Sequence, residues 1–458
     1  MYDDLRFDDR ELAAMARGQD PALYDTGDAR RLLRYHREHL NLWRFDSEIP
    51  DPRPLLLRRI ADARTMHQAL CDTLRNGGGS HGPNGRRLEY LDRSDRWALS
   101  RTLARALRLG TYRRGGERRL KVPKAGKPGR FREITIQNAE DRIVGRAATL
   151  ILSPFFDPGF SPYSFGFRPG LGVEHALATA ITIAESRGLW TWISADVANA
   201  FDVVPFQRFI QVLRQWQLPD DLIEFLKIVS YTGKSRGIPQ GSSLSPLLFN
   251  MFADWVLDKP WLKRHFGRPL LRYADDLLVL CMSPQEAAVL YEELSRRCRS
   301  AGLPLKPEGP GFIDLSAGGS IQWLGYRISL GANGIEIHIA DRAWNKLGDN
   351  LQEAYLHPAP PIRAAQTVQG WLQYIGPCVA FEDRQGVLDR VYTVAETLAF
   401  NELPPADELI EIMDDARSRW EDVQRRIAAT VQYQLNPDAG GDGSAVEDDR
   451  EEVAAVEL

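Results

Sequence analysis

Two adjacent aspartates interrupt an apolar stretch of the chain, in the sequence LRYADDLLVL at residues 271–280. The flanking residues are of strand-forming types, which predicts two short strands joined by a tight turn at Asp275 and Asp276. Two neighbouring carboxylates at the ends of apolar strands repel each other unless a positive charge lies beside them. A bound divalent cation would supply that charge, so this turn is the first candidate for a catalytic site.

A third carboxylate follows another apolar strand. The sequence LWTWISADV at residues 189–197 is typical of a buried strand, and Asp196 lies near its end. Asp196 and Asp275, assisted by Asp276, could clamp two metal ions roughly 3.5–4 Å apart. Such a pair activates an attacking hydroxyl and stabilises the leaving oxygen of a phosphoryl transfer, and Mg²⁺ suits carboxylate ligands combined with substrate phosphates. An isolated pair of aspartates is far more often a solvated turn, so other motifs must support this interpretation.

The elements that would position these carboxylates alternate between helices and strands. Leucines recur every fourth residue in SDRWALSRTLARALRLG, which predicts a helix over 94–110 with Ser94 or Asp95 as its cap and Gly110 at its C′ position. The other expected elements are a helical region over 1–85, a glycine-rich loop over 76–85, a basic stretch over 112–134, helices over 139–152, 205–216 and 284–301, a hairpin over 321–340 turning at Asn333-Gly334, a helical region over 341–400 broken at 357–361, and an acidic disordered tail from about 435.

The charges are divided unevenly along the chain. The net charge is −4, yet residues 401–458 hold 5 Lys and Arg against 16 Asp and Glu, so the preceding 400 residues hold 53 against 46. A moderately basic body can line a groove for nucleic acid even though the whole chain is acidic. The four cysteines lack metal-ligand spacing, no apolar run is long enough to span a membrane, and the polar N-terminus is unlike a signal peptide. These features predict a cytoplasmic protein without a membrane partner or a structural zinc.

Six sequence blocks occur in a fixed order along residues 85–330. They are LKVPKAGKPGRFREI (120–134) followed by Asp141-Arg142, YSFGFRPGLGVEHAL (163–177), SADVANAFD (194–202), GIPQGSSLSPLLFN (237–250), YADD (273–276) and WLGYRI (323–328). Each resembles a block of group II intron-like bacterial reverse transcriptases, and YADD resembles their YxDD signature. Because six ordered blocks are far more specific than one motif, the chain is identified as a member of this family, free-standing and without an HNH endonuclease domain.

The resemblance implies an α+β fold. It implies a right-hand polymerase whose fingers and palm combine an antiparallel sheet with helices and whose thumb is helical. The implied regions are an N-terminal helical extension over 1–85, fingers and palm over 86–335, a thumb-like helical region over 336–400, a C-terminal helical segment over 401–434 and an acidic disordered tail over 435–458. The implied activity is RNA-directed DNA polymerisation, a nucleotidyl transfer from dNTPs to a primer 3′ end on an RNA template.

The resemblance also assigns roles to individual residues. Asp196, Asp275 and Asp276 are the implied catalytic residues, and together with Val197 they are the implied ligands of two Mg²⁺ ions, for which Mn²⁺ can substitute. The implied contacts of the incoming nucleotide are Lys124 and Arg130 at its triphosphate, Phe201 as a steric gate against a 2′-hydroxyl, and Gln240 and Gly241. Without the resemblance, the two basic residues fit a solvated loop equally well, and the phenylalanine fits a core position.

Template and primer contacts are implied in two further blocks. Arg168 contacts the template backbone or braces the fingers, with the brace slightly favoured. The primer 3′ end is positioned by Trp323, Leu324, Gly325 and Tyr326, for which an ordinary buried hairpin is the alternative.

One block departs from the family pattern. In GLPLKPEGPGFI at residues 302–313, Lys306 stands where the family has an asparagine, and Gly309 stands where it has a lysine near the triphosphate. Lys306 either substitutes for that lysine or leaves the general-acid step weaker.

Two other functions fit the same blocks. The chain is alternatively an RNA-binding, maturase-like protein with a vestigial polymerase site, or a polymerase that makes untemplated or repetitive DNA. Retention of the three aspartates together with Lys124, Arg130 and Gln240 argues against a vestigial site. The resemblance further suggests an antiviral role in bacterial defence against phages. The implied partners are an RNA template and a primer. Whether a dedicated non-coding RNA also binds is left open, as is the oligomeric state.

Overall fold

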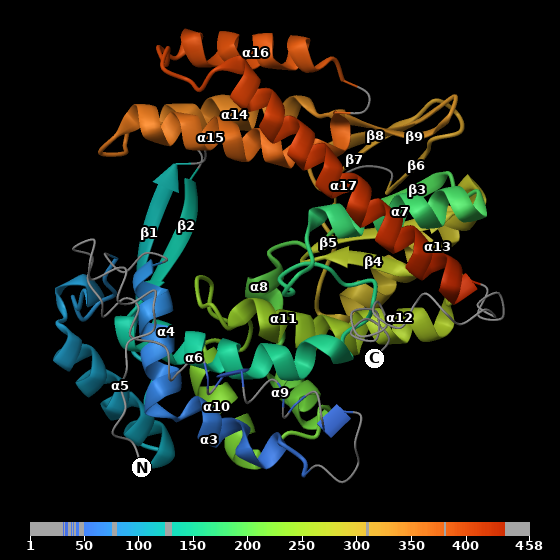
Figure 1. The fold of residues 1–458 in the computed structure, drawn as a ribbon. Coiled ribbons are helices and arrows are strands. Elements are labelled where there is room, and N and C mark those ends of the chain that lie inside the picture. Colours follow the sequence, from blue (N-terminus) through green and yellow to red (C-terminus); the bar gives the residue numbers. More distant parts are fainter. Residues whose placement is uncertain are drawn as a thin grey trace, which may run out of the picture.

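The computed structural model describes residues 31, 33, 34, 38, 40, 43, 44, 50–75, 80–123, 131–307, 311–379 and 382–435. Its helices surround antiparallel sheets, so the predicted α+β fold class is confirmed. Figure 1 shows the N-terminal helices and a β-ribbon on one side, a central sheet on the other and C-terminal helices across the top, as expected of a right-hand polymerase. The predicted tail lies outside the described residues from 436 onward, and the boundaries of the five predicted regions stay predictions.

The central sheet has four antiparallel strands in the order β4-β5-β3-β6. They are β3 (Thr191–Asp196), β4 (Leu270–Tyr273), β5 (Asp276–Cys281) and β6 (Phe312–Asp314). The strand expected over 189–197 and the two short strands on either side of the aspartates are therefore confirmed. β3 and β5 pair from Thr191 opposite Cys281 to Asp196 opposite Asp276.

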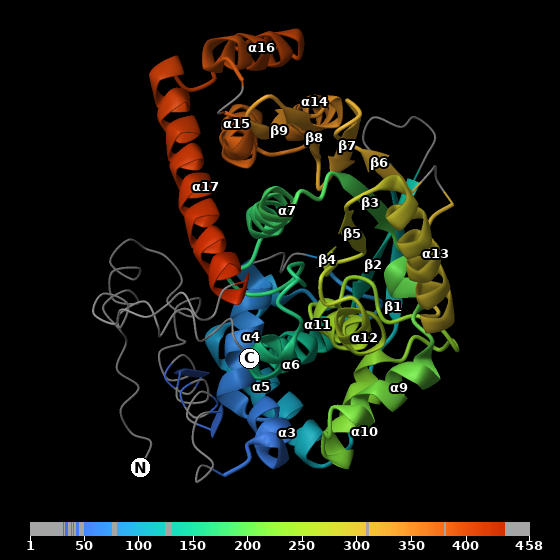
Figure 2. The same ribbon diagram turned by 90° about the vertical axis from the view of Figure 1, so that its right-hand side faces the viewer.

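Helices cover both faces of this sheet. They are α7 (Val173–Arg187), α8 (Ala200–Val203), α9 (Phe206–Gln215), α10 (Asp220–Ser230), α11 (Ser245–Ala253), the π-helix η5 (Asp254–Asp258), α12 (Lys259–Arg264) and α13 (Pro284–Ala301). The helix expected over 284–301 matches α13, which Ser283 caps by accepting a hydrogen bond from the Glu286 N–H. In Figure 2, α7 and α13 lie on opposite sides of the central strands.

Alternate residues of the central strands enter two different hydrophobic cores. Ile193 and Val279 pack in one core with residues of α11 and α13. Trp192 and Leu280 pack in the other, with residues of α7 and the C-terminal helices. Neighbouring strand residues point to opposite faces, so a sheet covered on both sides requires apolar side chains at nearly every position. This explains why the sequences around the aspartates are apolar without a clear alternation.

The N-terminal part of the described chain is helical and carries a β-ribbon. Its elements are η2 (Arg53–Leu55), α3 (Leu56–Ile60), α4 (Ala63–Arg75), η3 (Leu88–Tyr90), α5 (Arg93–Arg108), β1 (Glu117–Pro123), β2 (Phe131–Gln137), α6 (Ala139–Phe156) and η4 (Asp157–Gly159). The basic stretch forms the ribbon, in which β1 and β2 pair antiparallel. The buried Asp141 anchors its base by accepting hydrogen bonds from the Tyr112 hydroxyl at 2.6 Å and the Gly115 N–H at 3.0 Å.

The start of α5 corrects one expectation. Asp92, rather than Ser94 or Asp95, is the N-cap, and its carboxylate accepts a hydrogen bond from the Asp95 N–H at 2.7 Å. An N-cap side chain satisfies a free N–H two or three residues ahead, so Asp92 can begin the helix one residue earlier than the leucine pattern suggested. Gly110 follows the C-cap with φ 64°, as predicted.

The hairpin expected over 321–340 is a three-stranded sheet instead. Its strands are β7 (Ser320–Trp323), β8 (Tyr326–Gly331) and β9 (Gly334–Ile339), in sequence order. Gly331 pairs with Gly334, so the turn residues are Ala332 and Asn333, one position earlier than expected. The sequence offered only one Asn-Gly signal, whereas the second turn, at Leu324-Gly325, uses two residues with positive φ.

The C-terminal helices are α14 (Asp341–Ala354), α15 (Pro360–Tyr374), η6 (Gly376–Cys378), α16 (Arg384–Thr397) and α17 (Ala406–Leu435). The predicted break at 357–361 separates α14 from α15. Figure 2 shows α17 crossing from these helices to α7, against which it packs. Within the described ranges, no helix combines the length and apolar character that crossing a lipid bilayer requires.

Candidate active site

The register of the central sheet brings the three aspartates together. Asp196 is the last residue of β3 and lies directly opposite Asp276, the first residue of β5. Asp275 lies in the turn between β4 and β5, and its carbonyl accepts a hydrogen bond from the Val197 N–H at 3.0 Å. Asp196 and the adjacent pair Asp275 and Asp276, about eighty residues apart in sequence, thus share one end of the sheet.

The carboxylates of this cluster disfavour one another's charge. Burial, followed by the charges of Asp196 and Asp275, raises the pKa of Asp276 to about 6. Burial and the charge of Asp196 also raise the pKa of Asp275. All three side chains are half-buried, so water screens their repulsion only in part. The cluster therefore favours a bound cation.

Lys306 supplies a positive charge at this end of the sheet. Its Nζ lies 2.7 Å from Asp196 Oδ1, and its N–H donates to the Asp196 carbonyl at 2.8 Å. Leu305 forms an antiparallel bridge with Val197, so the segment after α13 runs along the end of β3. Burial lowers the pKa of Lys306, but the hydrogen bond and charges of the aspartates outweigh it, and the pKa is raised. Gly309 lies outside the described residues.

The residues present fit divalent cations. The donor set consists of carboxylates, which are the ligands that Mg²⁺ prefers. Apart from the ion pair with Lys306, Asp196 Oδ1 is buried without a hydrogen-bond partner in the part of the chain that the structure describes. The Val197 side chain is apolar and buried, so only its carbonyl could act as a ligand. Among the described residues of this structure, no three His, Cys, Asp or Glu side chains are grouped so that they could hold a metal ion.

Phe201 and Gln240 lie on the segments that follow the first aspartate and precede α11. The Phe201 ring is half-buried and contacts the rings of Phe249 and Phe167, with centroids 5.4 Å and 6.2 Å away. Gln240 donates a hydrogen bond to Asp202 Oδ2 at 2.7 Å, which ties the two segments together. The backbone of the Phe201 segment accepts a hydrogen bond from the Ile238 N–H at 2.8 Å.

Gly241 is a position where only glycine fits. Its φ is 81°, and an added Cβ would lie 2.5 Å from the carbonyl oxygen of Thr135 on β2. The close approach predicted for this glycine is therefore to the β-ribbon, and a nucleotide contact stays a prediction. Lys124 and Arg130 belong to the connection between β1 and β2, and they lie outside the described residues.

Comparison with known proteins agrees with this geometry. A family model described as reverse transcriptase (RNA-dependent DNA polymerase) matches residues 122–328, the range that contains the aspartate cluster. Over these residues the chain is similar to the reverse transcriptase family. The group II intron-encoded protein LtrA of Lactococcus lactis subsp. cremoris is 28% identical over 166 residues, which cover 34% of this chain and 27% of LtrA.

Two further matches, one by sequence and one by structure, cover more of this chain than LtrA does. Protein YkfC of Escherichia coli (strain K12) is 30% identical over 222 residues, or 43% of this chain and 55% of YkfC. The chain thus spans about half the length of this relative. Telomerase from Candida albicans, solved in complex with a fragment of telomeric RNA, has a TM-score of 0.37 at 11% identity, covering 70% of this chain and 67% of that one.

The guanidinium of Arg168 forms its hydrogen bonds within its own loop region. It donates to the Asp157 side chain at 2.8 Å and to the carbonyls of Ser161 and Ser164 at 3.0 Å and 2.7 Å. Only 8% of the Arg168 side chain is exposed. These contacts are those of a brace, and contact with a template stays a prediction.

The hairpin predicted to grip the primer is mostly buried. Trp323 and Tyr326 are 2% and 1% exposed, so both pack in the core of the domain. The Tyr326 hydroxyl donates to the Tyr374 carbonyl at 2.6 Å, and an added Cβ on Gly325 would lie 2.1 Å from the Tyr374 hydroxyl oxygen. Of the four residues predicted to position the primer, Leu324 and Gly325 in the turn are half-exposed and could contact it.

Phe167 lies beside the candidate site, and no sequence pattern indicated its position there. Its φ is 62°, and its side chain is 51% exposed beside the Phe201 ring. A bulky residue with positive φ is strained by on the order of 1–3 kcal/mol, and such strain persists where surrounding structure enforces it. The GFRPG sequence contained the residue, but no periodicity marks a strained aromatic.

Replacing Asp276 with asparagine is expected to stabilise the metal-free protein at pH 8. The pKa of Asp276 is about 6 in the folded protein against an ordinary value of 3.8. Above pH 6 the carboxylate is charged in both the folded and the unfolded protein, and placing that charge in the cluster costs free energy of folding. We expect a gain of about 1–3 kcal/mol in the free energy of unfolding, after allowing for solvent screening. Urea titration in chelator would measure it.

The pH dependence of that gain provides the control. The destabilisation by wild-type Asp276 is present above the folded pKa of about 6 and fades as the pH falls toward 3.8, so the two proteins should converge in stability near pH 4. A loss of stability in Asp276→Asn at pH 8 would contradict the repulsion described above.

Proposed function

We propose that this chain is an RNA-directed DNA polymerase that extends a primer 3′ end with dNTPs on an RNA template by two-metal catalysis. The observation that carries the proposal is the placement of Asp196 opposite Asp276, with Asp275 beside them, at one end of the sheet of a reverse transcriptase domain.

Asp196, Asp275, Asp276 and the carbonyl of Val197 would hold the ions, Mg²⁺ or in its place Mn²⁺. Two such ions activate an attacking hydroxyl and stabilise a leaving phosphate oxygen. The protein's own contribution is to fix the ligands. Strand pairing sets Asp196 and Asp276, and the hydrogen bond from the Val197 N–H fixes the backbone of Asp275. Rigid ligands lower the reorganisation needed during the reaction.

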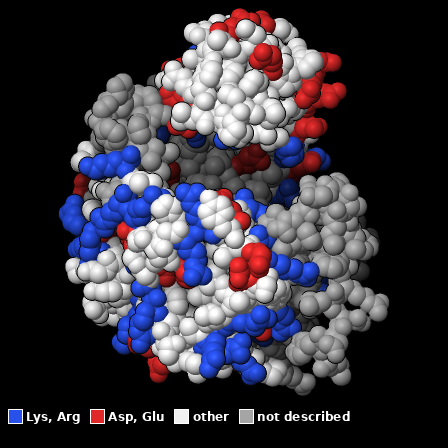
Figure 3. All heavy atoms as spheres, turned by 90° about the vertical axis from the view of Figure 1, so that its left-hand side faces the viewer, with Lys and Arg blue, Asp and Glu red and all other residues white. Residues whose placement is uncertain are grey.

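The charge distribution supports a nucleic-acid partner. Figure 3 shows Lys and Arg gathered on the lower part of one face, below a hollow, whereas Asp and Glu lie at the margin of the C-terminal helices above it. On α5, Arg101, Arg105 and Arg108 are exposed and follow one another at helical spacing. Basic side chains attract the phosphate backbone without regard to sequence.

Replacing Phe201 with alanine is expected to admit ribonucleotides. A ring under the sugar excludes a 2′-hydroxyl, and its removal should reduce the preference for dNTPs over NTPs roughly tenfold or more. Steady-state incorporation of each nucleotide measures the ratio of kcat/KM values. Phe201→Tyr keeps the ring and serves as the matched control. An unchanged preference in Phe201→Ala would show that the ring only packs against Phe249 and Phe167.

Primer extension tests the proposal directly. Purified protein would be given labelled dNTPs, Mg²⁺ or Mn²⁺ and a primed RNA of known sequence, with and without chelator. The proposal predicts a product whose sequence is complementary to the RNA and whose formation stops in chelator. Product that ignores the template sequence would favour untemplated synthesis. RNA binding without any product would favour the maturase-like alternative.

The biological setting is a further part of the proposal. Following the family resemblance, we place the enzyme in the bacterial cytoplasm, in defence against phages, with a dedicated non-coding RNA as one of its partners. Phage plating on cells that express the wild-type chain or Asp275→Asn tests the first point. RNA that co-purifies with the protein and serves as its template would identify the partner. Equal plating efficiency on both strains would remove the defence role.

A further inference from the structure

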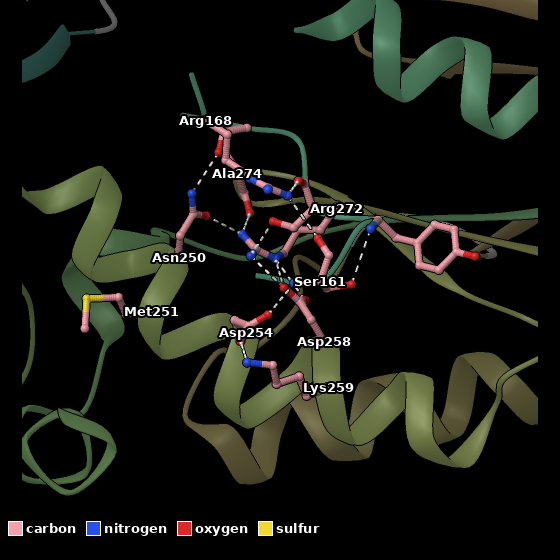
Figure 4. Close-up of polar contacts among 12 residues, drawn as sticks. Ser161, Arg168, Asn250, Met251, Asp254, Asp258, Lys259, Arg272 and Ala274 are labelled. Atoms are coloured by element: carbon pink, nitrogen blue, oxygen red, sulfur yellow. Dashed lines mark hydrogen bonds and ion pairs between the residues drawn. The ribbon is translucent and has the colours of Figure 1, made fainter. Parts of the chain in front are cut away.

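Arg272, on β4 just before the YADD sequence, uses every donor of its guanidinium. Its Nε and Nη2 donate to the carboxylate of Asp258 at 2.9 Å and 2.6 Å, and Nη2 also donates to the Ser164 hydroxyl at 2.7 Å. Its Nη1 donates to Asn250 Oδ1 at 2.8 Å and to the Ala274 carbonyl at 3.2 Å. An arginine has five N–H groups, so none is left for solvent or substrate. Figure 4 shows this network around the buried side chain.

One of these hydrogen bonds reaches the turn that presents Asp275. Ala274 has φ 58°, a conformation that costs a residue with a side chain on the order of 1–3 kcal/mol. The hydrogen bond from Arg272 to the Ala274 carbonyl closes the turn in this conformation. The aspartate that follows is therefore held by a backbone that would otherwise relax.

A second set of contacts reaches the same turn from the loop that precedes α7. Asn250 accepts from Arg272 and donates to the carbonyl of Gly166 at 2.9 Å. Gly166 lies directly against the turn, since an added Cβ would be 2.3 Å from the Ala274 nitrogen. The Arg272 backbone binds the same loop, because its N–H donates to the Tyr163 carbonyl at 2.8 Å. Loop, helix and turn thus meet at one guanidinium.

Two acidic residues on the π-helix η5 differ in their connection to the turn. Asp258 and Arg272 form an ion pair in which both side chains are 1% exposed. Asp254 is also buried, but it accepts from the Ser161 N–H at 2.7 Å and pairs with Lys259 at 2.8 Å. Burial and the neighbouring Asp258 raise the pKa of Asp254. In Figure 4 both carboxylates project from the same helical segment, yet only Asp258 reaches Arg272.

We propose that Arg272, held by Asp258, is a positioning residue that sets the Ala274 turn and thereby aims the Asp275 carboxylate at the metal ions. The planar guanidinium suits this task because it fixes several acceptors in one rigid fork, which a lysine cannot do. The proposal rests on the proposed polymerase function for its kinetic consequences, whereas its consequence for metal binding is independent of activity.

Asp258→Asn and Asp254→Asn form a matched pair for the test. Both remove one buried carboxylate charge from η5, but only the first loosens Arg272. We expect Asp258→Asn to lower kcat on the order of 10- to 100-fold, because displacement of a reacting group by about 1 Å has effects of this size. The KM for dNTP should stay within about twofold, since Asp275 does not bind the base or sugar. Mn²⁺ binding followed by electron paramagnetic resonance should weaken severalfold.

The control variant and a conservative substitution complete the experiment. Asp254→Asn should keep kcat and Mn²⁺ affinity within about twofold of the wild type at a similar cost in Tm. If Asp258→Asn fails to fold, Arg272→Lys decides the question, because it keeps the buried charge and loses the fork. The proposal would be overturned if Asp258→Asn and Asp254→Asn had the same kcat and the same Mn²⁺ affinity. It would also be overturned if Arg272→Lys kept the wild-type values of both. Inactive wild-type protein would instead contradict the polymerase function, and Mn²⁺ binding would still test the positioning role.

Discussion

Replacing Asp275 with asparagine is expected to lower kcat for dNTP incorporation on the order of 10³-fold, or roughly 4 kcal/mol in transition-state stabilisation. The amide keeps the shape of the side chain, but it removes a negative charge from the cluster formed with Asp196 and Asp276. Metal ions bound by fewer carboxylates stabilise the developing charge less well. Single-turnover extension of a primed RNA measures the change, with dNTP at saturation so that binding does not contribute.

Asp314→Asn is the matched control for this substitution. Asp314 ends β6 in the same sheet, is half-buried and accepts hydrogen bonds from the Ser316 N–H and hydroxyl at 2.9 Å and 2.6 Å. Its register opposite Thr191 places it at the other end of β3 from Asp196. We expect activity within about twofold of the wild type. Comparable losses in both variants would mean that the sheet, rather than the metal site, is sensitive to charge.

The second large effect is expected from Gly166→Ala. An added Cβ would lie 2.3 Å from the Ala274 nitrogen, a backbone atom that can move only if the catalytic turn moves with it. We expect a loss of about 1–3 kcal/mol or more in the free energy of unfolding from overpacking. In the fraction that folds, kcat should fall on the order of 10- to 100-fold because Asp275 is displaced. Urea titration and single-turnover extension measure the two effects separately.

Gly172→Ala tests whether the effect belongs to this contact. Gly172 lies in the same loop region with extended backbone, and an added Cβ would meet no atom within 4 Å. Gly172 is the N-cap of α7, where alanine is less favourable than glycine, so its replacement should cost no more than about 1 kcal/mol and leave kcat within about twofold of the wild type. If Gly166→Ala is as mild as this control, the loop is free to shift, and the packing of Gly166 against the turn does not position Asp275.

The charges of the aspartate cluster link the proposed metal site to the stability of the fold. The raised pKa values of Asp275 and Asp276 follow from burial and from neighbouring carboxylates, and both disfavour the charged forms that metal binding requires. Lys306, which pairs with Asp196, offsets this repulsion only in part, although its charge also acts to lower the pKa values of Asp275 and Asp276. The expected gain in stability for Asp276→Asn and the expected loss of activity for Asp275→Asn are therefore two consequences of the same arrangement.

The sequence by itself determined the local elements and selected the residues of the candidate site. The apolar strands around Asp196 and the paired aspartates, the helix over 284–301 and the order of six blocks are all encoded in short stretches. Strand and helix periodicity depends on neighbours within a few residues, so it can be recognised without a structure. The aspartates were identifiable because charged residues rarely follow apolar strands without a reason.

Only the tertiary structure decided which distant residues complete the site. The pairing of Asp196 with Asp276 depends on strand register, and a slip of one residue would turn either carboxylate to the other face. The ion pair of Lys306 with Asp196 and the network of Arg272 join segments that no local pattern connects. In the sequence, a fully buried arginine looks like any exposed one, because its burial is set by long-range packing.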